Sequence, residues 1–428
     1  MSRRTGDRQP HSETHGADIA DSYSVIIRPE WSGLIGLDWA RPLLDWQDDR
    51  IVELPRGLSR HEVRFLALYG ATFALKELPG DLATREYHAL RRLEELGGSA
   101  VRPAGLVVRR LLDPGSEQSG VVITRYVDYS FSYRELLSGE SFGRRRDQLL
   151  DAFAFLLVEL HLLGCFWGDC SLSNVLYRYD AGAIETLLVD AETTALHPSL
   201  SDGQRQHDLS IMVDNVGGEM GDIAAAQGVS LDAADLGLGE DIARRYERLW
   251  AELGSEQRIP VDRQYLITER IAKLNDLGFQ VDELEVIPHP GRDHLHLRLK
   301  VGDRNFHNSR LRELTGVEAA ENQARQILAD LRYFEVKEGR GEPAKPLLRM
   351  RWRVEEFEPW LRRLASHLPA GADPLQAYCD LLHHRYLLSA EAGWDVGTEA
   401  AFQHWLSSDR PGYPLAGEGS GPSEPPAC

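Results

Sequence analysis

Cysteine is scarce in this chain of 428 residues, which has only four, at Cys165, Cys170, Cys379 and Cys428. Their small number and wide scatter exclude the disulfide framework that stabilises small secreted domains. The Cys165 and Cys170 pair lacks the two further ligands that a structural zinc site needs. We therefore expect reduced thiols.

Long hydrophobic runs are also missing. Nowhere do about 18 or more apolar residues follow one another, which is the length expected of a membrane-spanning helix. The first residues, MSRRTGDRQPHSETHGADIA, are polar and lack the apolar segment of a signal peptide. The sequence therefore predicts no stable membrane insertion and a cytoplasmic location.

Positive charge is in deficit, because 48 Lys and Arg residues stand against 67 Asp and Glu residues, for a formal net charge of −19. That field repels phosphate backbones, so a nucleic acid partner is not expected without a strong local basic patch. Lysine is rarer still. Lys76 is the only lysine in the first 272 residues, in a chain that otherwise uses arginine.

The remaining composition is that of a globular protein, with 42% hydrophobic and 27% charged residues. At roughly 100 to 200 residues per domain, the length favours two domains. The Gly-, Pro- and Ser-rich ends cannot bury enough apolar area to become ordered. We therefore predict four segments: a disordered N-terminus at 1–20, a first domain at 21–258, a second at 259–408 and a disordered tail at 409–428.

The hydrophobic pattern predicts strands first and helices later in the first domain. Strands are expected at 71–78, 104–112 and 120–127, a helix at 82–98, a long buried helix at 147–164, and a further strand from 183 to Asp190. This order predicts a small antiparallel sheet lobe followed by a larger helical lobe, an α+β fold. The second domain has the periods of helices and one hairpin, and is expected to be α+β or mostly α.

Two charged residues of the sheet lobe could bind nucleotide. Phosphoryl transfer from ATP requires a lysine on the phosphates, oxygen ligands for magnesium, and a carboxylate facing the acceptor hydroxyl. Lys76, in FALKEL, lies on a predicted strand, and Glu86 lies on the next helix, where it can pair with that ammonium. A phosphate site suits a compact ammonium better than a guanidinium, which explains a lysine here.

Three residues of the larger lobe complete the set. Asp169, in GCFWGDCSLSNVLY, follows the buried helix and is the candidate base. Asn174 follows five residues later, and Asp190 ends an apolar strand, so both can offer oxygen to a hard cation such as magnesium. This spacing is typical of a kinase catalytic loop. The alternative is a polar turn between a helix and a strand, in which Asp169 and Asn174 act as caps.

Several segments of the sequence resemble known families. ELHLLGCFWGDCSLSNVLY and LLVDAETT are similar to the lipopolysaccharide kinase family within the protein-kinase-like superfamily. LSDGQRQHDL and TGVEAAENQARQIL resemble an uncharacterised domain that accompanies this kinase-like part in high-GC Gram-positive bacteria. The resemblance implies a protein-kinase-like bilobal fold for the first domain and assigns no chemistry to the second.

The resemblance also implies roles for the matching positions. Lys76 and Glu86, with Thr124 and Tyr126 at the end of GVVITRYV, are predicted to bind ATP. Asp169 is then the catalytic base, and the metal ligands are Asn174 and Asp190.

The predicted function is an ATP- and Mg²⁺-dependent kinase that transfers the γ-phosphoryl group to a hydroxyl of a protein or carbohydrate acceptor. The fold and the phosphoryl chemistry are carried over from the family, but a lipopolysaccharide acceptor is not.

Two departures from the kinase pattern leave an alternative open. Trp167 and Gly168 stand where protein kinases carry His-Arg, and ELPRGLSRH lacks the several glycines of a phosphate-covering loop. A weak or inactive pseudokinase, acting as a nucleotide-sensing or partner-binding module, is therefore the alternative prediction.

Overall fold

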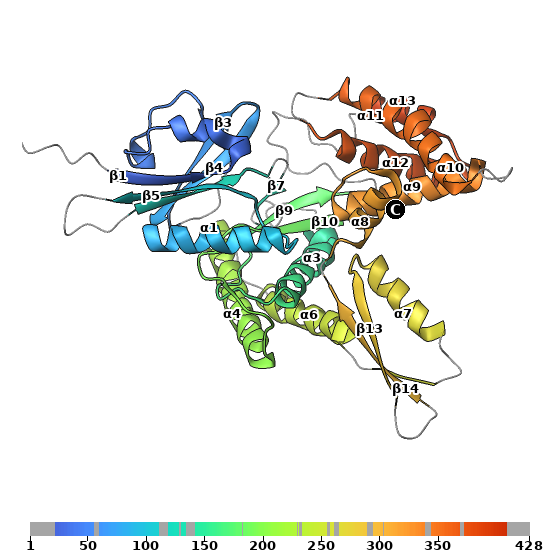
Figure 1. Ribbon diagram of the computed structural model, residues 1–428, viewed down its shortest axis with the longest axis horizontal. Helices are drawn as coiled ribbons and strands as arrows, with labels where there is room; N and C mark the ends of the chain where they lie inside the picture. The colour runs from blue at the N-terminus through green and yellow to red at the C-terminus, as the bar shows by residue number, and fades with distance from the viewer. Residues whose placement is uncertain are drawn as a thin grey trace, which may run out of the picture.

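The computed structural model describes the chain in fourteen stretches (Figure 1). These are residues 22–54, 60–110, 119–127, 130–133, 142–181, 183–228, 230, 233–254, 257–260, 265–288, 294–302, 304–338, 344–368 and 372–408. The predictions of disorder at 1–20 and 409–428 lie outside the described residues, as do residues 55–59 of the glycine-poor loop.

The first lobe is a six-stranded antiparallel sheet with the spatial order β1-β5-β6-β4-β3-β2 (Figure 1). Its strands are β1 (Ser22–Ile27), β2 (Ile51–Val52), β3 (Glu62–Leu68), β4 (Ala71–Pro79), β5 (Pro103–Arg110) and β6 (Ser119–Arg125). β4 lies between β3 and β6, so the sheet supports Lys76 from both sides.

Alternation along β4 sends its side chains to two different cores. Phe73 and Leu75 pack under the two short 3-10 helices η1 (Pro29–Gly36) and η2 (Leu43–Asp45), which cover the outer face of the sheet. Leu78 points to the opposite face, against helix α1 (Gly80–Glu95). Neither β1 nor the two 3-10 helices were predicted, because such short segments leave no readable hydrophobic period.

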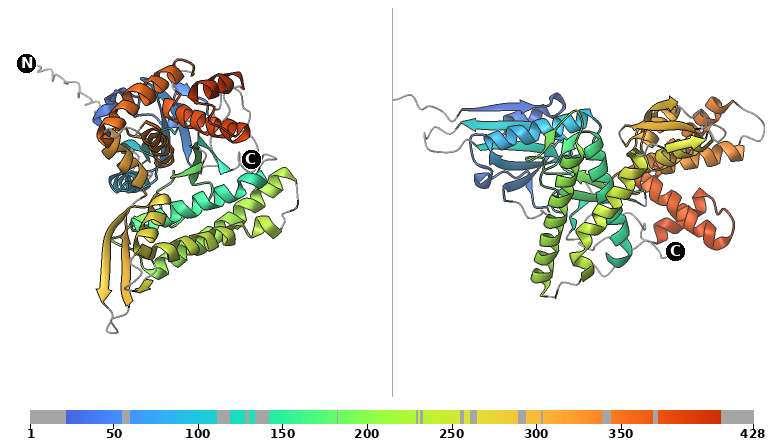
Figure 2. Two further views of the ribbon diagram at one scale, coloured as in Figure 1. Left: turned by 90° about the vertical axis from the view of Figure 1, so that its right-hand side faces the viewer. Right: turned by 90° about the horizontal axis from the view of Figure 1, so that it is seen from below.

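The second lobe is built on three long helices that lie side by side (Figure 2). They are α3 (Phe142–Leu162), α4 (Asp202–Gln227) and α6 (Leu238–Gly254), with the short α5 (Ala233–Leu236) before α6. Two small antiparallel ladders cross them: β7 (Ser130–Phe131) with β9 (Val175–Asp180) and β10 (Ala183–Leu188), and β8 (Cys165–Phe166) with β11 (Ala195–Leu196).

The C-terminal part has a small sheet and then helices. The sheet contains β12 (Gln257–Pro260), β13 (Val281–Pro288) and β14 (His294–Val301), with α7 (Tyr265–Asp276) beside it. The helices are α8 (Phe306–Thr315), α9 (Glu321–Glu338), α10 (Lys345–Arg351), the π-helical turn η5 (Trp352–Phe357), α11 (Glu358–Ala365), α12 (Pro374–Ala392) and α13 (Thr398–Ser407).

Helices α7 and α8 contribute to two different hydrophobic cores. Leu274 of α7 and the following Phe279 belong to the core of the second lobe. A separate core begins at Leu311 of α8 and runs to Trp405 of α13. The division at residue 258 stays a prediction, and α7 contributes its apolar side chains to the preceding lobe.

The predicted fold class is confirmed. The chain is α+β, with an antiparallel sheet lobe, a helical lobe and a helical C-terminal region. Cys165, Cys170 and Cys379 are free thiols, as expected. Among the helices that the structure describes, none combines the length and the apolar character needed to span a bilayer.

The tip of the β9–β10 hairpin enters the C-terminal helices. Asp180 is fully buried there, and its Oδ2 accepts a hydrogen bond of 3.2 Å from the backbone N–H of Asn322, at the start of α9. Burial, with a smaller contribution from Glu185, raises the pKa of Asp180 to about 7, and Arg178 only partly opposes this. Ionised Asp180 therefore destabilises the junction.

We predict that Asp180→Asn flattens the pH dependence of stability. The folded protein holds this proton between about pH 4 and pH 7 while the unfolded chain releases it, so stability falls as pH rises through that window. Between pH 5 and pH 8, urea unfolding of the wild type should lose about 1–3 kcal/mol relative to the variant. The exposed Asp81→Asn on α1 is the control. Parallel pH profiles of wild type and Asp180→Asn would contradict the prediction.

Candidate active site

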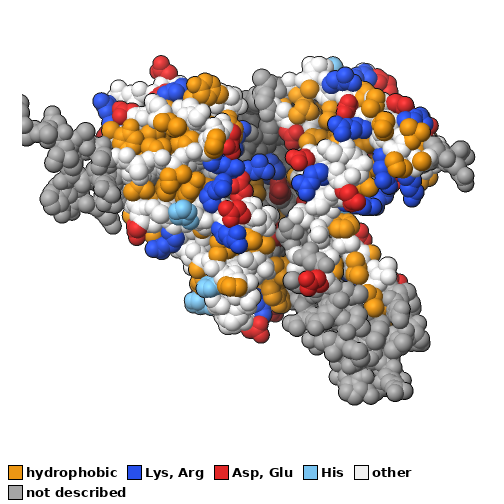
Figure 3. Space-filling view, viewed as in Figure 1, with side chains coloured by type: hydrophobic (Ala, Val, Ile, Leu, Met, Phe, Trp, Pro, Cys, Tyr) orange, Lys and Arg blue, Asp and Glu red, His pale blue; other side chains and the backbone are white. Residues whose placement is uncertain are grey.

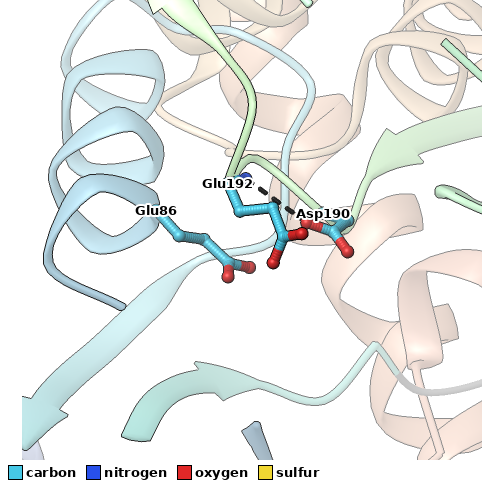
Figure 4. Close-up of side chains that lie close together, drawn as sticks. All are labelled: Glu86, Asp190 and Glu192. Carbon is cyan, nitrogen blue, oxygen red and sulfur yellow. Dashed lines mark hydrogen bonds between the residues drawn. The ribbon is translucent and has the colours of Figure 1, made fainter. Parts of the chain in front are cut away.

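The Lys76 ammonium lies at the centre of a carboxylate cluster. Its Nζ is 3.1 Å from Oε2 of Glu86 and 2.8 Å from Oδ2 of Asp190. Oε2 of Glu192 is 3.3 Å away. Figure 4 shows Glu86 approaching from α1, and Asp190 and Glu192 from the segment after β10. The structure thus brings together Lys76, Glu86 and Asp190, which were predicted to share one site.

Burial and charge act against each other in this cluster. Burial lowers the pKa of Lys76, but the carboxylates of Glu86 and Asp190 outweigh it and raise that pKa above its usual value, so the ammonium stays charged. Glu86 is only 1% exposed, and burial raises its pKa to about 7 although Lys76 opposes the shift. The ammonium is therefore what keeps an anionic Glu86 tolerable at neutral pH.

Glu192 was not predicted as a site residue. It follows Asp190 by two residues, and its backbone N–H donates to Oδ1 of Asp190 at 3.3 Å (Figure 4). It is 6% exposed and also lies 3.2 Å from Nε2 of His61 and 3.5 Å from Nη2 of Arg60. The sequence signal was a second acidic residue shortly after the β10 strand, and such a residue resembles an ordinary solvated loop charge.

Three of these carboxylates have the geometry of a cation site. Glu86, Asp190 and Glu192 can each place one oxygen within 4.8 Å of the other two. Oxygen atoms of this kind are the ligands that Mg²⁺ prefers. Asp190 is the most exposed of the three carboxylates, so its side chain is the one best placed to turn toward a metal ion.

Asn174 lies opposite Val189, the residue before Asp190, because the β9 and β10 ladder continues past the two strands. Val175 pairs with Leu188, and the N–H of Val189 then donates to the Asn174 carbonyl at 3.0 Å. The Nδ2 of Asn174 faces Asp169, so its Oδ1 points another way and suits a cation. The donor set at this end of the hairpin therefore fits magnesium.

The loop of residues 167–174, here called the Asp169 loop, holds its aspartate by two amides. Nδ2 of Asn174 donates to Oδ2 of Asp169 at 3.1 Å, and Nδ2 of Asn215 donates to Oδ1 at 3.0 Å. The second amide also donates to the carbonyl of Cys170 at 3.1 Å. Both oxygens of Asp169 are thus fixed in direction, which is what a positioned base needs.

One face of α4 anchors the Asp169 loop at both ends. Asp208 accepts the backbone N–H groups of Trp167 at 2.7 Å and Gly168 at 2.8 Å. Glu219 accepts those of Leu172 and Ser173, each at 2.9 Å.

The anchoring residues of α4 share one face. Asp208, Asn215 and Glu219 are separated by seven and then four residues, a spacing that places them on the same side of a helix. None of the three was predicted, because the contacts span about forty residues of sequence and leave no local pattern.

His161 supports the backbone of the Asp169 loop, which lacks the His-Arg pair of protein kinases. Its Nε2 lies 3.1 Å from Oδ2 of Asp208, and its Nδ1 lies 2.8 Å from the hydroxyl of Tyr246. Burial lowers the pKa of His161 despite the nearby Asp208. A neutral ring then donates from Nε2 and accepts from Tyr246. An imidazole from α3 thus supports the aspartate that holds Trp167.

The turn before the Asp169 loop requires glycine. Gly164 has φ 77°, and a Cβ at this position would lie 2.0 Å from the carbonyl oxygen of His197. The N–H of His197 also donates to the Gly164 carbonyl at 2.8 Å. The close contact between the ends of β8 and β11 therefore depends on the missing side chain.

Thr124 and Tyr126 lie on the Lys76 side of the sheet. Thr124 pairs with Ala74, two residues before Lys76, so these three side chains share one face. The ring of Tyr126 meets that of Phe65 edge-on, with centroids 5.4 Å apart. The structure therefore places both residues where the sheet ends beside the second lobe.

Charged side chains gather where the parts of the molecule meet. Figure 3 shows basic and acidic groups around the hollow between the sheet lobe and the C-terminal helices. An ammonium held among carboxylates can bind phosphate, and an aspartate held by two amides can accept the proton of a hydroxyl.

Two families match the chain. The Lipopolysaccharide kinase (Kdo/WaaP) family matches residues 70–223, and the Domain of unknown function (DUF4032) matches residues 248–409. Both agree with the resemblances predicted from the sequence.

One similar solved structure is described as "WaaP in complex with acyl carrier protein". It is 16% identical, covers 59% of this chain and 99% of its own, and has a TM-score of 0.36, too low to support an inference. No curated protein matches the chain.

Proposed function

Residues 70–223 match the lipopolysaccharide kinase (Kdo/WaaP) family, and on this premise we propose that the protein is an ATP- and Mg²⁺-dependent kinase. It transfers the γ-phosphoryl group of ATP to a hydroxyl of a protein or a carbohydrate. Because the proposed reaction consumes ATP, the proposal includes a cytoplasmic location for the protein.

The contact between Lys76 and the two residues Glu86 and Asp190 is the observation that carries the proposal. These residues come from a strand, a helix and a loop more than a hundred positions away, and the buried Glu86 carboxylate needs a positive partner to stay charged. The ammonium binds the ATP phosphates, and Glu86 keeps its position on the sheet. Thr124 and Tyr126, on the same face as Lys76, contact the rest of the nucleotide.

Asp190 and Asn174 are proposed to hold magnesium, with Glu192 as a further carboxylate. A bound Mg²⁺ ion would offset charge on the transferred phosphoryl group. Asp190 also contacts the Lys76 ammonium at 2.8 Å, so it would fix the position of the ammonium relative to the metal ion.

Asp169 is proposed as the general base. Its carboxylate accepts the proton of the acceptor hydroxyl as the oxygen attacks phosphorus. Asn215 and Asn174 fix its two oxygens, so the acceptor meets a carboxylate that does not need to reorient. The backbone of the Asp169 loop is held in turn by Asp208 and Glu219.

We predict that Asp190→Asn weakens magnesium-dependent ATP binding roughly 10-fold or more, because the amide removes an anionic ligand. Calorimetric titration with ATP, with and without Mg²⁺, measures the effect. Asp214→Asn is a matched control, since Asp214 is exposed on α4 next to Asn215 and loses the same charge. If Asp190→Asn keeps the magnesium dependence of the wild type, Asp190 is not a ligand and the proposed function loses its metal site.

A further inference from the structure

The Lys76 ammonium has as many carboxylate partners as it has N–H groups. A lysine side chain carries three donors and no acceptor. Its Nζ contacts Asp190 at 2.8 Å, Glu86 at 3.1 Å and Glu192 at 3.3 Å, and Figure 4 shows these three carboxylates close together. A phosphate oxygen therefore gains a full hydrogen bond from this ammonium only when one carboxylate gives up its donor.

The three carboxylates also leave a surplus of negative charge around Lys76. Burial raises the pKa of Glu86 to about 7, but Asp190 and Glu192 exceed the single ammonium even when Glu86 is protonated. Arg60 also contacts Glu192, but its side chain is 81% exposed, so solvent screens most of its charge. This surplus disfavours a triphosphate that arrives without a cation.

Of the three carboxylates, Glu192 is the one best able to give up its donor. Glu86 is 1% exposed, and a buried carboxylate needs its positive partner. Asp190 makes the shortest contact with Lys76, and its second oxygen is free to face a metal ion without breaking that contact. Glu192 makes the longest contact, at 3.3 Å.

Two residues before β3 give Glu192 other partners. Nε2 of His61 lies 3.2 Å from its Oε2, and Nη2 of Arg60 lies 3.5 Å from its Oε1. His61 comes two positions before Val63, which pairs with Lys76 across the two strands. The Glu192 carboxylate can therefore move off the ammonium over a short distance and keep donors for its charge.

We propose, on the basis of the kinase function proposed above, that Glu192 selects the magnesium complex of the nucleotide against the free nucleotide. Its carboxylate holds one donor of Lys76 and repels the phosphates of free ATP. With Mg²⁺ bound beside Asp190, the negative charge that faces the phosphates falls. Glu192 then gives up its donor to the triphosphate, while His61 and Arg60 keep its charge partnered.

Calorimetric titration of the full chain with inorganic triphosphate in EDTA, without nucleotide, tests this role. Glu192→Gln should bind triphosphate roughly 10-fold or more tightly than the wild type, because a neutral amide holds the Lys76 donor weakly and does not repel phosphate. Glutamine keeps the shape of the side chain, so the fold should be retained. Glu192→Ala, which also removes the oxygen on Lys76, should gain at least as much affinity.

Glu62→Gln is the matched control, because it removes the same charge from the edge of the same site. Glu62 follows His61 and pairs with Arg64 at 2.7 Å. Across the strands it lies opposite Glu77, one position beyond Lys76, so its side chain takes the other face of the sheet. Its triphosphate affinity should equal that of the wild type.

Titration with ATP, with and without Mg²⁺, gives the second expected result. The ratio of the two affinities should fall roughly 10-fold or more in Glu192→Gln, because the gain is confined to the metal-free ligand. No gain in triphosphate affinity in either Glu192 variant, or an equal gain in Glu62→Gln, would overturn the proposal.

The role of Glu192 and the kinase function fail separately. If Glu192→Gln gains triphosphate affinity while the wild type transfers no phosphoryl group, the role of Glu192 stands and the kinase function does not. If the wild type transfers the group and the Glu192 variants gain no triphosphate affinity, only the role of Glu192 is wrong.

Discussion

Asp169→Asn is expected to lower phosphoryl transfer by roughly 10²-fold or more while ATP affinity stays close to that of the wild type. The substitution keeps the size of the side chain and removes its ability to accept a proton. In the proposed mechanism Asp169 contacts the acceptor hydroxyl and not the nucleotide, so the two measurements should separate.

Turnover and ATP binding should be measured on the same preparations. Asp214→Asn again serves as the control for loss of one carboxylate on the surface of α4. Thermal unfolding should be compared as well, because Asn215 and Asn174 both donate to Asp169 and the variant loses part of that contact. Turnover retained in a folded Asp169→Asn protein would mean that the Asp169 loop is a polar turn with no catalytic role.

Lys76→Met should reduce both ATP affinity and transfer, with a combined loss in kcat/KM of roughly 10²-fold or more, as for other groups that stabilise transition-state charge. Without the ammonium, Glu86, Asp190 and Glu192 lose their shared positive partner and repel the phosphates. Methionine fills a similar volume without a charge, so the fold of β4 should tolerate it better than it would alanine.

Lys273→Met is the matched control for this variant. Lys273 is an exposed lysine of α7, paired with Glu252 at 2.8 Å, and lies outside the proposed site. Both variants should be checked for cooperative unfolding before kinetics are compared. A Lys76→Met protein with the kcat/KM of the wild type would remove Lys76 from the active site, and with it the contact that carries the proposed function.

The positions of Lys76, Glu86 and Asp190 could be anticipated from sequence for a physical reason. Alternation in β4 fixes which face each side chain takes, and a helix directly after an antiparallel strand packs back on that face. Asp190 follows an apolar strand that was expected to be buried. Local periods and chain order were therefore sufficient to predict that these three residues meet, and the structure places the carboxylates of Glu86 and Asp190 within 3.1 Å of the Lys76 ammonium.

The support beneath the site could not be anticipated in this way. Asp208, Asn215 and Glu219 matter because α4 lies against the Asp169 loop, and this packing is a tertiary contact with no local signature. From the sequence alone, these three residues resemble ordinary polar residues on the surface of a helix. Glu192 was missed for a related reason, since one acidic residue in a loop is usually solvated, and in this fold it contacts Lys76.

Trp167 and Gly168 stand where protein kinases carry His-Arg, and the structure shows how the Asp169 loop is held without that pair. His161, six residues before Trp167, supplies an imidazole to Asp208, which holds the loop backbone. The same aspartate also accepts the N–H of Gly168. The loop is therefore anchored without the usual pair of residues.

Incubation of the full chain with γ-labelled ATP and Mg²⁺, alone and with cell extract, tests the proposed kinase activity most directly. We expect label to move from ATP to a hydroxyl of a protein or carbohydrate with the wild type and Asp214→Asn, and not to move with Asp169→Asn. If the wild type binds ATP with Mg²⁺ but transfers no label to any component, the protein is a nucleotide-binding module and not a kinase.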